Sequence, residues 1–506
     1  MTTATAPLHL TAALSDDSTV LLAERSLLHD LVSALGSPLN IIVPQRIREN
    51  LAGFQRVLAD RHITGQVYYA HKANRSSALV RELAATNARI DVASLAELQH
   101  VLGCGFRPDR IMATGPKTPE MLWLGATVGI TINVDGVDEL ETLARTVSAA
   151  DLPPVRVLVR FGEFPALGTT VLSKRSRFGC TPADIDPIVA VLDKHRGTLE
   201  LHGVAFHLDT VGAAEKTRAI EGSLGVLGEF ARRGFSPTVI DIGGGFGVNY
   251  LAHAQEWENF TTALGAALLG RRDHITWQGA GYGLRNDGGR LRGTLGLYPA
   301  YRPVAGPSYL ADLLDSPAAA TRRPLGTMIL ESMYDLYIEP GRALLDQCGF
   351  ALARVLEVRA TAGGETLIRL DMNARDVSLE EHGVQLDPVV VAAPGERSGA
   401  PRGEYSPGPG SGYLIGNLCL ESDLISRRRI DFRVMPTPGD LLAFPNTAGY
   451  FMDFSADHAL AQPIAAKVAM YRRSDGWAWT LDEQYWPTVS RPAGDIDSRY
   501  DDHEER

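Results

Sequence analysis

Residues 60–270 alternate short runs of β-branched and aromatic residues with longer runs of helical character. This spacing is typical of successive βα units, which form a parallel sheet. The number of units favours a closed (β/α)8 barrel over a doubly wound open sheet. The predicted strands are residues 66–73, 89–94, 110–115, 130–136, 155–161, 201–210 and 238–245.

The pattern changes after Gly341, where β-rich segments are separated by Gly and Pro. These segments predict a second, mainly β domain over residues 339–488, following a barrel over residues 60–338. The last residues, 489–506, are charged and poor in apolar side chains, which favours a disordered tail.

One barrel unit is unusually long. About three times the usual ~30 residues separate Gly245 from Glu339, which predicts an insertion at about residues 272–325. Its Gly, Tyr and Pro content suits an ordered loop or lid. An inert surface excursion is an equally weighted interpretation.

The composition disfavours several classes of partner, site and location. The formal net charge of -11 disfavours nucleic acid or an anionic membrane as a partner, since both need a basic face. The four cysteines form no CxxC pair, which argues against a disulfide framework and a metal site. The N-terminus lacks the pattern of an export signal, and no apolar run has the length of a membrane span. A cytoplasmic protein that acts on a small molecule is expected.

Lys72 ends the first predicted strand, and barrel active sites form where strands end. A solvated lysine at the rim is the simpler alternative. A nucleophilic lysine must be deprotonated part of the time, which burial and nearby positive charge promote. Asp91 and Glu97 follow the next strand and are candidates to position Lys72, although capping of a helix N-terminus would also explain them.

Further along the chain, Gly243, Gly244 and Gly245 follow an apolar strand, where their N–H groups suit a phosphate. The spacing is not that of a nucleotide P-loop.

Glu339 offers a carboxylate for a pyridine nitrogen, and Arg342 offers a charged donor for phosphate. His207 suits contact with a cofactor ring, although a lone strand histidine is more often a core residue.

With these motifs in this order, residues 60–470 resemble the fold-type III pyridoxal-phosphate-dependent decarboxylases, which include diaminopimelate, ornithine and arginine decarboxylases. The resemblance implies pyridoxal 5'-phosphate as cofactor and an alanine racemase-like barrel. It also implies a homodimer with shared active sites, and an N-terminal segment, residues 1–59, that joins the β domain.

The resemblance further implies roles for single residues. Lys72 is similar to the Schiff-base lysine, and His207 to the ring-stacking histidine. Gly243, Gly244 and Gly245 correspond to the phosphate loop, Glu339 to the partner of the pyridine nitrogen, and Arg342 to a phosphate contact. The set is completed by Asp91 near the cofactor, Thr210 at a serine position, and Tyr450, which resembles a tyrosine that closes on the phosphate.

The segment from Cys419 to Asp423 matches the family's cysteine motif. By resemblance, Cys419 donates a proton to the substrate carbon from across the dimer interface. Leu420 stands where ornithine and diaminopimelate decarboxylases carry an acidic residue that binds the distal amine. A buried ammonium facing Leu420 loses its partner at a cost of several kcal/mol unless Glu421 replaces it, so a simple diamino acid is disfavoured.

Two other departures follow. Residues 371–383 lack the arginine-proline-x-leucine-tyrosine run of diaminopimelate decarboxylase, which argues against lysine biosynthesis. Asp209 adds a carboxylate beside the histidine motif, and Thr210 replaces a serine. These changes suggest a divergent branch that acts on a larger or less basic amino acid, such as an intermediate of specialised metabolism.

The leading hypothesis is therefore α-decarboxylation of an amino acid or amino-acid conjugate, with Lys72, His207 and Cys419 as the catalytic residues. Racemisation or epimerisation on the same fold is the alternative. A protein that binds pyridoxal phosphate without turnover is disfavoured by the presence of both Lys72 and Cys419.

Overall fold

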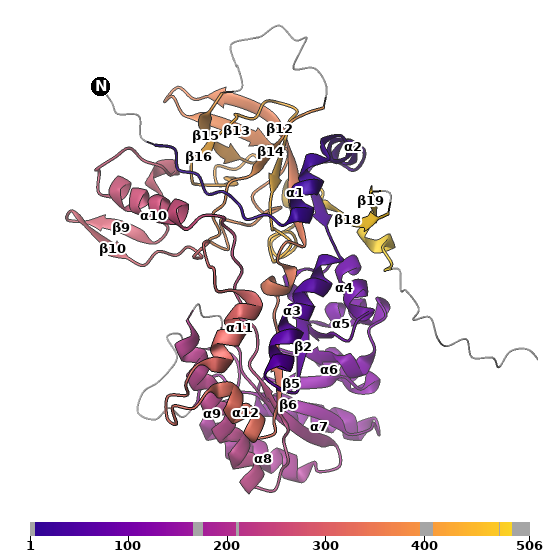
Figure 1. Ribbon diagram of the computed structural model, residues 1–506. Coiled ribbons are helices and arrows are strands. Elements are labelled where there is room, and N and C mark those ends of the chain that lie inside the picture. Colours follow the sequence, from indigo (N-terminus) through magenta and orange to yellow (C-terminus); the bar gives the residue numbers. More distant parts are fainter. Residues whose placement is uncertain (1–5, 165–175, 209–211, 395–407, 475, 488–506) are drawn as a thin grey trace, which may run out of the picture.

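The computed structural model describes residues 6–164, 176–208, 212–394, 408–474 and 476–487. Asp209, Thr210 and the predicted tail, residues 489–506, lie outside these ranges. Figure 1 shows two units, a barrel with surrounding helices and a β-rich domain. Within the described ranges, no helix is both long enough and apolar enough to cross a membrane.

Eight parallel strands form the closed barrel that the repeated βα pattern predicts. The ring closes where β11 pairs with both β8 and β2. The strand β11 is absent from the predicted series because it follows the insertion, outside the regular spacing of the βα units. The barrel strands are β2 (Gly65–Ala70), β3 (Arg89–Val92), β4 (Ile111–Ala113), β5 (Thr131–Val134), β6 (Val155–Arg160), β7 (Leu199–Ala205), β8 (Val239–Asp241) and β11 (Asp335–Ile338).

Amphipathic helices cover the outside of the barrel (Figure 1). They are α3 (Arg46–Asp60), α4 (Ser77–Ala84), α5 (Leu95–Gly103), α6 (Pro119–Val128), α7 (Val137–Ala149), α8 (Ile185–Lys194), α9 (Ala213–Arg232), α11 (Gly306–Asp315) and α12 (Leu325–Glu331). The expected boundary at residue 59 is wrong for α3, which packs against β2, α4 and α11 of the barrel. The reason is its apolar face, formed by Ile47, Leu51, Phe54 and Leu58.

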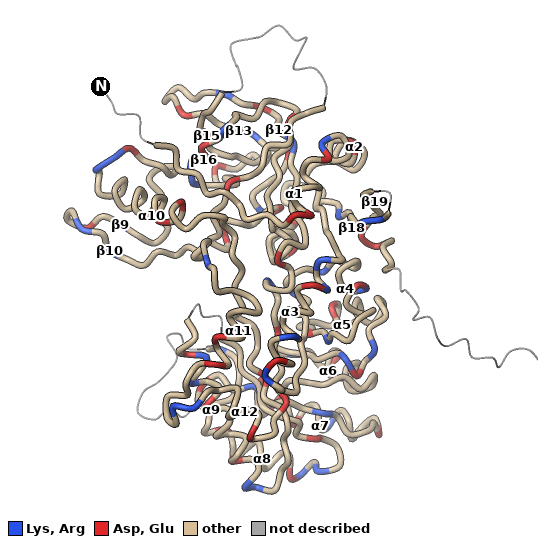
Figure 2. The backbone as a smooth tube through the Cα atoms, in the orientation of Figure 1, with Lys and Arg blue, Asp and Glu red and all other residues tan. Residues whose placement is uncertain are grey.

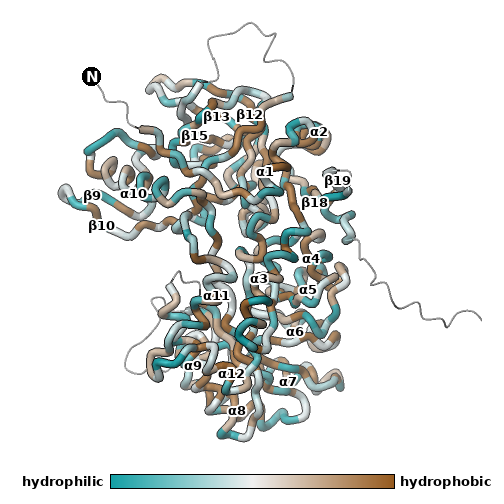
Figure 3. The backbone as a smooth tube through the Cα atoms, in the orientation of Figure 1, coloured by the Kyte–Doolittle hydropathy of each residue, from teal (hydrophilic) through white to brown (hydrophobic). Residues whose placement is uncertain are grey.

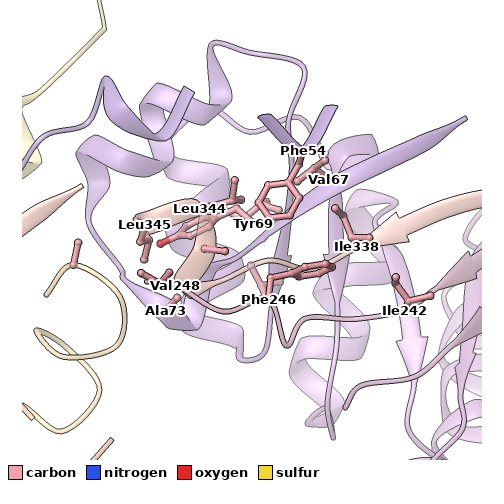
Figure 4. Close-up of a cluster of buried hydrophobic side chains, with 14 of the residues drawn as sticks. Phe54, Val67, Tyr69, Ala73, Ile242, Phe246, Val248, Ile338, Leu344 and Leu345 are labelled. Atoms are coloured by element: carbon pink, nitrogen blue, oxygen red, sulfur yellow. The ribbon is translucent and has the colours of Figure 1, made fainter. Parts of the chain in front are cut away.

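A hydrophobic cluster fixes the loop that follows β8 (Figure 4). The ring of Phe246 meets that of Phe54 edge to face, with centroids 5.3 Å apart. Both rings are nearly or fully buried, and burial of such a side chain is worth about 1.5–3 kcal/mol. The glycine-rich loop is therefore anchored at its far end to the helix α3.

A nine-stranded sheet forms the β domain. Its strands are β1 (Leu39–Ile42), β12 (Gly349–Ala360), β13 (Thr366–Leu370), β14 (Val389–Val391), β15 (Gly410–Ile415), β16 (Ile430–Phe432), β17 (Leu441–Phe444), β18 (Ala466–Arg473) and β19 (Gly476–Leu481). The N-terminal strand β1 lies between β12 and β18. The helices α1 (Asp16–Ala23) and α2 (Arg25–Leu35) precede it. Apolar segments concentrate in the strands of both units (Figure 3).

The segment that leaves the barrel differs from the expected insertion at residues 272–325. It already includes α10 (Ala254–Leu268) and the hairpin of β9 (Leu284–Asp287) and β10 (Arg290–Gly293), which lie beside the β domain (Figure 1). The N–H of Trp277 donates to the carbonyl of Arg427 at 2.7 Å, which joins the segment to the β domain. The chain returns with α11 and α12, because their apolar faces pack on the barrel helices α3 and α9.

Charged residues of both signs are interspersed over the two units (Figure 2). Cys104, Cys180 and Cys348 are buried thiols, Cys419 is an exposed thiol, and none of the four forms a disulfide. In the part of the chain that the structure describes, no group of His, Cys, Asp and Glu side chains could hold a metal ion.

Candidate active site

A cavity of about 320 Å³ opens at the ends of the barrel strands. Active sites of this barrel type form at this face because the loops after successive strands converge there. Lys72, His207 and Glu339, which are far apart in sequence, all line it. The described lining residues are Lys72, Ala93, Thr114, Gly115, Pro116, Asn133, Arg160, Phe178, Phe206, His207 and Glu339.

Lys72 lies in the 3-10 turn η1 (His71–Ala73), directly after β2. Burial acts to lower the pKa of Lys72, but the negative charges of Asp91, Tyr450 and Glu339 outweigh it and the pKa is raised. The sequence-based expectation that burial and positive charge promote the free amine is therefore wrong for the net effect. The reason is that two carboxyl groups of the barrel face the ammonium group.

Three buried carboxyl groups converge here: Asp91 on β3, Asp241 on β8 and Glu339 after β11. Burial raises the pKa of all three, and the charge of Glu339 raises those of Asp91 and Asp241 further. The hydroxyl of Thr114 donates to Asp91 at 2.6 Å. Since adjacent carboxylates do not all ionise in a buried volume, the cluster retains protons near neutral pH.

The glycine-rich loop requires glycine at each of its three positions. Gly243 and Gly245 have φ angles of +62° and +83°, which side chains disfavour. A Cβ on Gly243 would lie 2.5 Å from the carbonyl oxygen of Phe206, and one on Gly244 would lie 2.9 Å from that of Glu339. The loop thus brings its bare backbone against the strand ends of the cavity.

His207 connects this loop to the cavity. The N–H of Gly244 donates to Nδ1 of His207 at 3.2 Å, so Nδ1 is the unprotonated nitrogen in this contact. The same Nδ1 lies 3.9 Å from Oε2 of Glu339. The imidazole is therefore oriented by the backbone of the glycine-rich loop, next to the carboxyl group of Glu339.

Arg342 is enclosed by aromatic rings. Its guanidinium carbon lies 5.0 Å from the ring centroid of Tyr298, 5.5 Å from that of Tyr450 and 6.0 Å from that of Tyr250. Its Nη1 donates to the hydroxyl of Tyr250 at 3.1 Å. The planar cation is thus held by ring faces and one hydrogen bond.

Tyr450 comes from the β domain and reaches the turn that carries Lys72. Its N–H donates to the carbonyl of Ala73 at 2.7 Å, and its own φ angle is +72°, an uncommon value for a side-chain-bearing residue. Its hydroxyl lies 2.7 Å from where a Cβ on Gly341 would stand. The two units therefore meet at this site.

Two histidines in contact, His71 and His100, lie behind Lys72 and were not predicted from the sequence. Nδ1 of His71 lies 3.2 Å from Oε1 of Glu97, and His71 is buried. Glu97 also accepts the N–H of Ala93 at 2.7 Å in the first turn of α5, whose N-cap is Ser94. Glu97 therefore acts as a helix cap and holds His71 rather than Lys72 itself. The signal in the sequence was a histidine directly before Lys72, at the end of a buried strand.

Arg160 and Phe178 were also missed. Arg160 is the last residue of β6, and Lys72 lies in the turn directly after β2, so a cation at a strand end was the available signal. Its guanidinium lies 5.0 Å from the ring centroid of Phe178 and 3.4 Å from Asp135. A second cation thus lines the cavity.

The cysteine motif lies elsewhere in the single chain. Cys419 and Glu421 are exposed, and Leu420 is 46% exposed. None of them is among the described residues that line the cavity. Asp423 is buried, and its carboxylate accepts the N–H groups of Leu418 at 2.7 Å and Ala374 at 2.8 Å. Asp423 therefore shapes the loop, and a direct contact with substrate stays a prediction.

Comparisons with known proteins identify relatives of this chain over most of its length. Residues 45–276 match the family model "Pyridoxal-dependent decarboxylase, pyridoxal binding domain". An uncharacterized protein, y4yA, of Sinorhizobium fredii is 29% identical over 89% of this chain and 91% of its own. Diaminopimelate decarboxylase of Methanothermobacter thermautotrophicus is 25% identical over 87% of this chain and 88% of its own.

Among solved structures, diaminopimelate decarboxylase of M. jannaschii in complex with L-lysine superposes with a TM-score of 0.66. The alignment covers 94% of this chain and 95% of that one at 18% sequence identity. A likeness at this identity shows a shared fold, a barrel followed by a β domain.

Proposed function

We propose a reaction for this chain, which is a divergent member of the fold-type III pyridoxal-phosphate-dependent decarboxylases. It removes the α-carboxylate of an amino acid that is larger or less basic than ornithine or meso-diaminopimelate. The observation that carries the choice of substrate is the pair Leu420 and Arg160. The first is apolar at the family's amine-binding position, and the second places a cation in the cavity.

The residues of the site fit pyridoxal 5'-phosphate. The glycine-rich loop leaves no room for a Cβ on any of its three glycines, as expected where a backbone cradles a phosphate. A buried carboxyl group, Glu339, and an amine, Lys72, line the same cavity. When bound, the cofactor supplies an electron sink for the electron pair that remains when carbon dioxide leaves.

Each residue then has a proposed task. Lys72 binds the aldehyde through Nζ, and Glu339 holds a proton at the pyridine nitrogen. His207 contacts the ring, while Arg342 and Tyr450 bind the phosphate together with the glycine-rich loop. Thr210 is proposed for the same phosphate and lies outside the described residues.

The carboxyl groups around Lys72 have a task of their own. Lys72 must lose a proton from Nζ before it reacts, and its raised pKa makes this loss unfavourable in isolation. Asp91 and Glu339 act on the charge of Lys72, so whichever of the two is ionised is a suitable acceptor for that proton. The pair is therefore proposed to set how readily Lys72 becomes a free amine.

The choice of substrate follows from charge. A diamino acid carries a distal ammonium group that must be neutralised when water is excluded. Arg160 would repel such a group, and its pairing with Asp135 at 3.4 Å only partly offsets this. A neutral or acidic distal group avoids the repulsion, which favours a larger or less basic substrate.

A second copy of the chain completes the proposed site. Cys419 is an exposed thiol outside the cavity of its own chain, which suits a proton donor that acts in the partner's site. The homodimer and its shared active sites are part of the proposal. Racemisation is the second candidate and is less favoured, because the relatives named for a function are decarboxylases.

The test uses the purified protein loaded with pyridoxal phosphate and a panel of amino acids with basic, neutral, acidic and aromatic side chains. Released carbon dioxide and the mass of each product are measured, with Lys72→Ala as the inactive control. Release from a neutral or acidic amino acid supports the proposal. Turnover of ornithine or meso-diaminopimelate alone overturns the substrate assignment, and inversion at the α-carbon without release of carbon dioxide establishes a racemase.

A further inference from the structure

We infer that Lys216, on helix α9, is a cation of the cofactor's phosphate subsite in this chain. The inference rests on the identity of the cofactor and is independent of the proposed substrate. It adds a residue to the phosphate loop, Arg342 and Tyr450, at a place where the sequence motifs indicated nothing.

The position of Lys216 on the glycine-rich loop carries the inference. Its side chain is fully buried, and its Nζ donates to the carbonyl of Gly244. The same nitrogen lies 3.3 Å from where a Cβ on Gly245 would stand, and 4.6 Å from the ring centroid of Phe246. The ammonium group is thus in contact with the loop residues that are proposed to receive the phosphate.

The electrostatics of the helix α9 also favour a phosphate at this position. Lys216 is in the first turn of α9, which begins at Ala213. The positive end of a helix dipole disfavours a cation and favours an anion. A dianionic phosphate beside the loop would be stabilised by both the helix terminus and the ammonium group.

The segment that leaves the barrel holds the residues directly after the three glycines. The hydroxyl of Tyr298 accepts the N–H of Val248 at 2.8 Å and donates to the carbonyl of the same residue at 3.0 Å. The guanidinium of Arg302 occupies the space where a Cβ on Gly247 would stand. The loop is therefore contacted by α9 at Gly244 and by this segment at Gly247 and Val248, and both contacts restrict its movement.

The experiment compares the affinity of the apoprotein for pyridoxal phosphate with its affinity for pyridoxal, which has the same ring and aldehyde without the phosphate. Lys216→Met is expected to weaken binding of pyridoxal phosphate about tenfold or more and to change pyridoxal binding less than about twofold. Lys216→Arg is expected to restore part of the loss. Equal weakening of both ligands, or no change in either, overturns the inference.

Lys117→Met is the matched control, because Lys117 is also a buried lysine but its ammonium group contacts Glu139 at 2.9 Å. That variant is expected to leave the ratio of the two affinities unchanged. If Lys216→Met does not fold, the phosphorus NMR resonance of bound pyridoxal phosphate is compared between the wild type and Lys216→Arg. A shifted resonance supports the inference, and an identical one overturns it.

Discussion

Nε2 of His71 lies 2.9 Å from Nδ1 of His100, directly behind the turn that carries Lys72. Nε2 of His100 in turn lies 3.0 Å from the hydroxyl of Ser77. Two imidazoles in contact do not both become positively charged at low cost. Burial, followed by the charge of His71, accordingly lowers the pKa of His100 to about 4.

This pair predicts a stability that depends on pH. The folded-state pKa of His100 lies below the value of 6.5 expected when the chain is unfolded, so the unfolded state binds the proton first. The free energy of unfolding is therefore fully retained above about pH 6.5 and falls as the pH is lowered toward 4. Because the ring is partly exposed, we expect a loss on the order of 1 kcal/mol.

Chemical denaturation at pH 7.5 and pH 4.5 measures this loss for the wild type and for His100→Gln. The variant cannot bind the extra proton, so its loss should be smaller by about the same 1 kcal/mol. Equal losses in both proteins would assign the pH dependence to other groups.

Lys72→Ala is expected to lose the visible absorbance band of lysine-bound pyridoxal phosphate and to slow carbon dioxide release at least about 10³-fold. The reason is that Lys72 supplies the amine in the turn after β2. Lys72→Arg keeps a cation between Asp91 and Glu339 and should retain more thermal stability than Lys72→Ala. A persistent absorbance band in Lys72→Ala would refute the assignment.

Glu339→Gln removes the charge proposed to face the pyridine nitrogen and should slow carbon dioxide release on the order of 10²-fold. The same change should lower the pKa of Asp91 and of Asp241, because the charge of Glu339 raises both. Infrared difference spectra recorded as a function of pH would detect that these carboxyl groups ionise at a lower pH. An unchanged rate together with unchanged carboxyl bands would remove Glu339 from both tasks.

Leu420→Asp should increase kcat/KM for ornithine about tenfold, because it restores a carboxylate at the position where the family binds the distal amine. Leu420→Asn is the matched control, since it has the same shape without the charge. The comparison requires steady-state rates of carbon dioxide release for all three proteins. No gain in the aspartate variant would mean that other residues set the distal pocket.

The sequence was most informative where chemistry and local structure coincide. Lys72 and the three glycines lie at predicted strand ends, and an apolar strand precedes each, so their placement at the same end of the barrel followed from the barrel alone. The contacts of Tyr298 and Arg302 with the glycine-rich loop could not be predicted, because they depend on the path of a long segment through space. The pairing of His71 with His100 was missed because it joins a strand end to the helix after the next strand.

Two other features of the structure could not be predicted from the sequence, for different reasons. The helix α3 was grouped with the wrong domain because an amphipathic pattern shows that a face is buried but not which partner buries it. Cys419 is exposed in the single chain, and the role proposed for it depends on a second chain that the sequence of one chain does not place. Sequence reasoning was therefore limited where a contact is made far along the chain or between chains.

The placement of β1 between β12 and β18 sets the order in which the molecule can be completed. The strand β1 has neighbours that are synthesised more than three hundred residues later. The barrel can close once β11 is made, while the β domain, and with it Tyr450, must wait for nearly the whole chain. Firm capture of the cofactor should therefore be one of the last events in the biogenesis of this protein, and truncation at the C-terminus should impair it even though the barrel is intact.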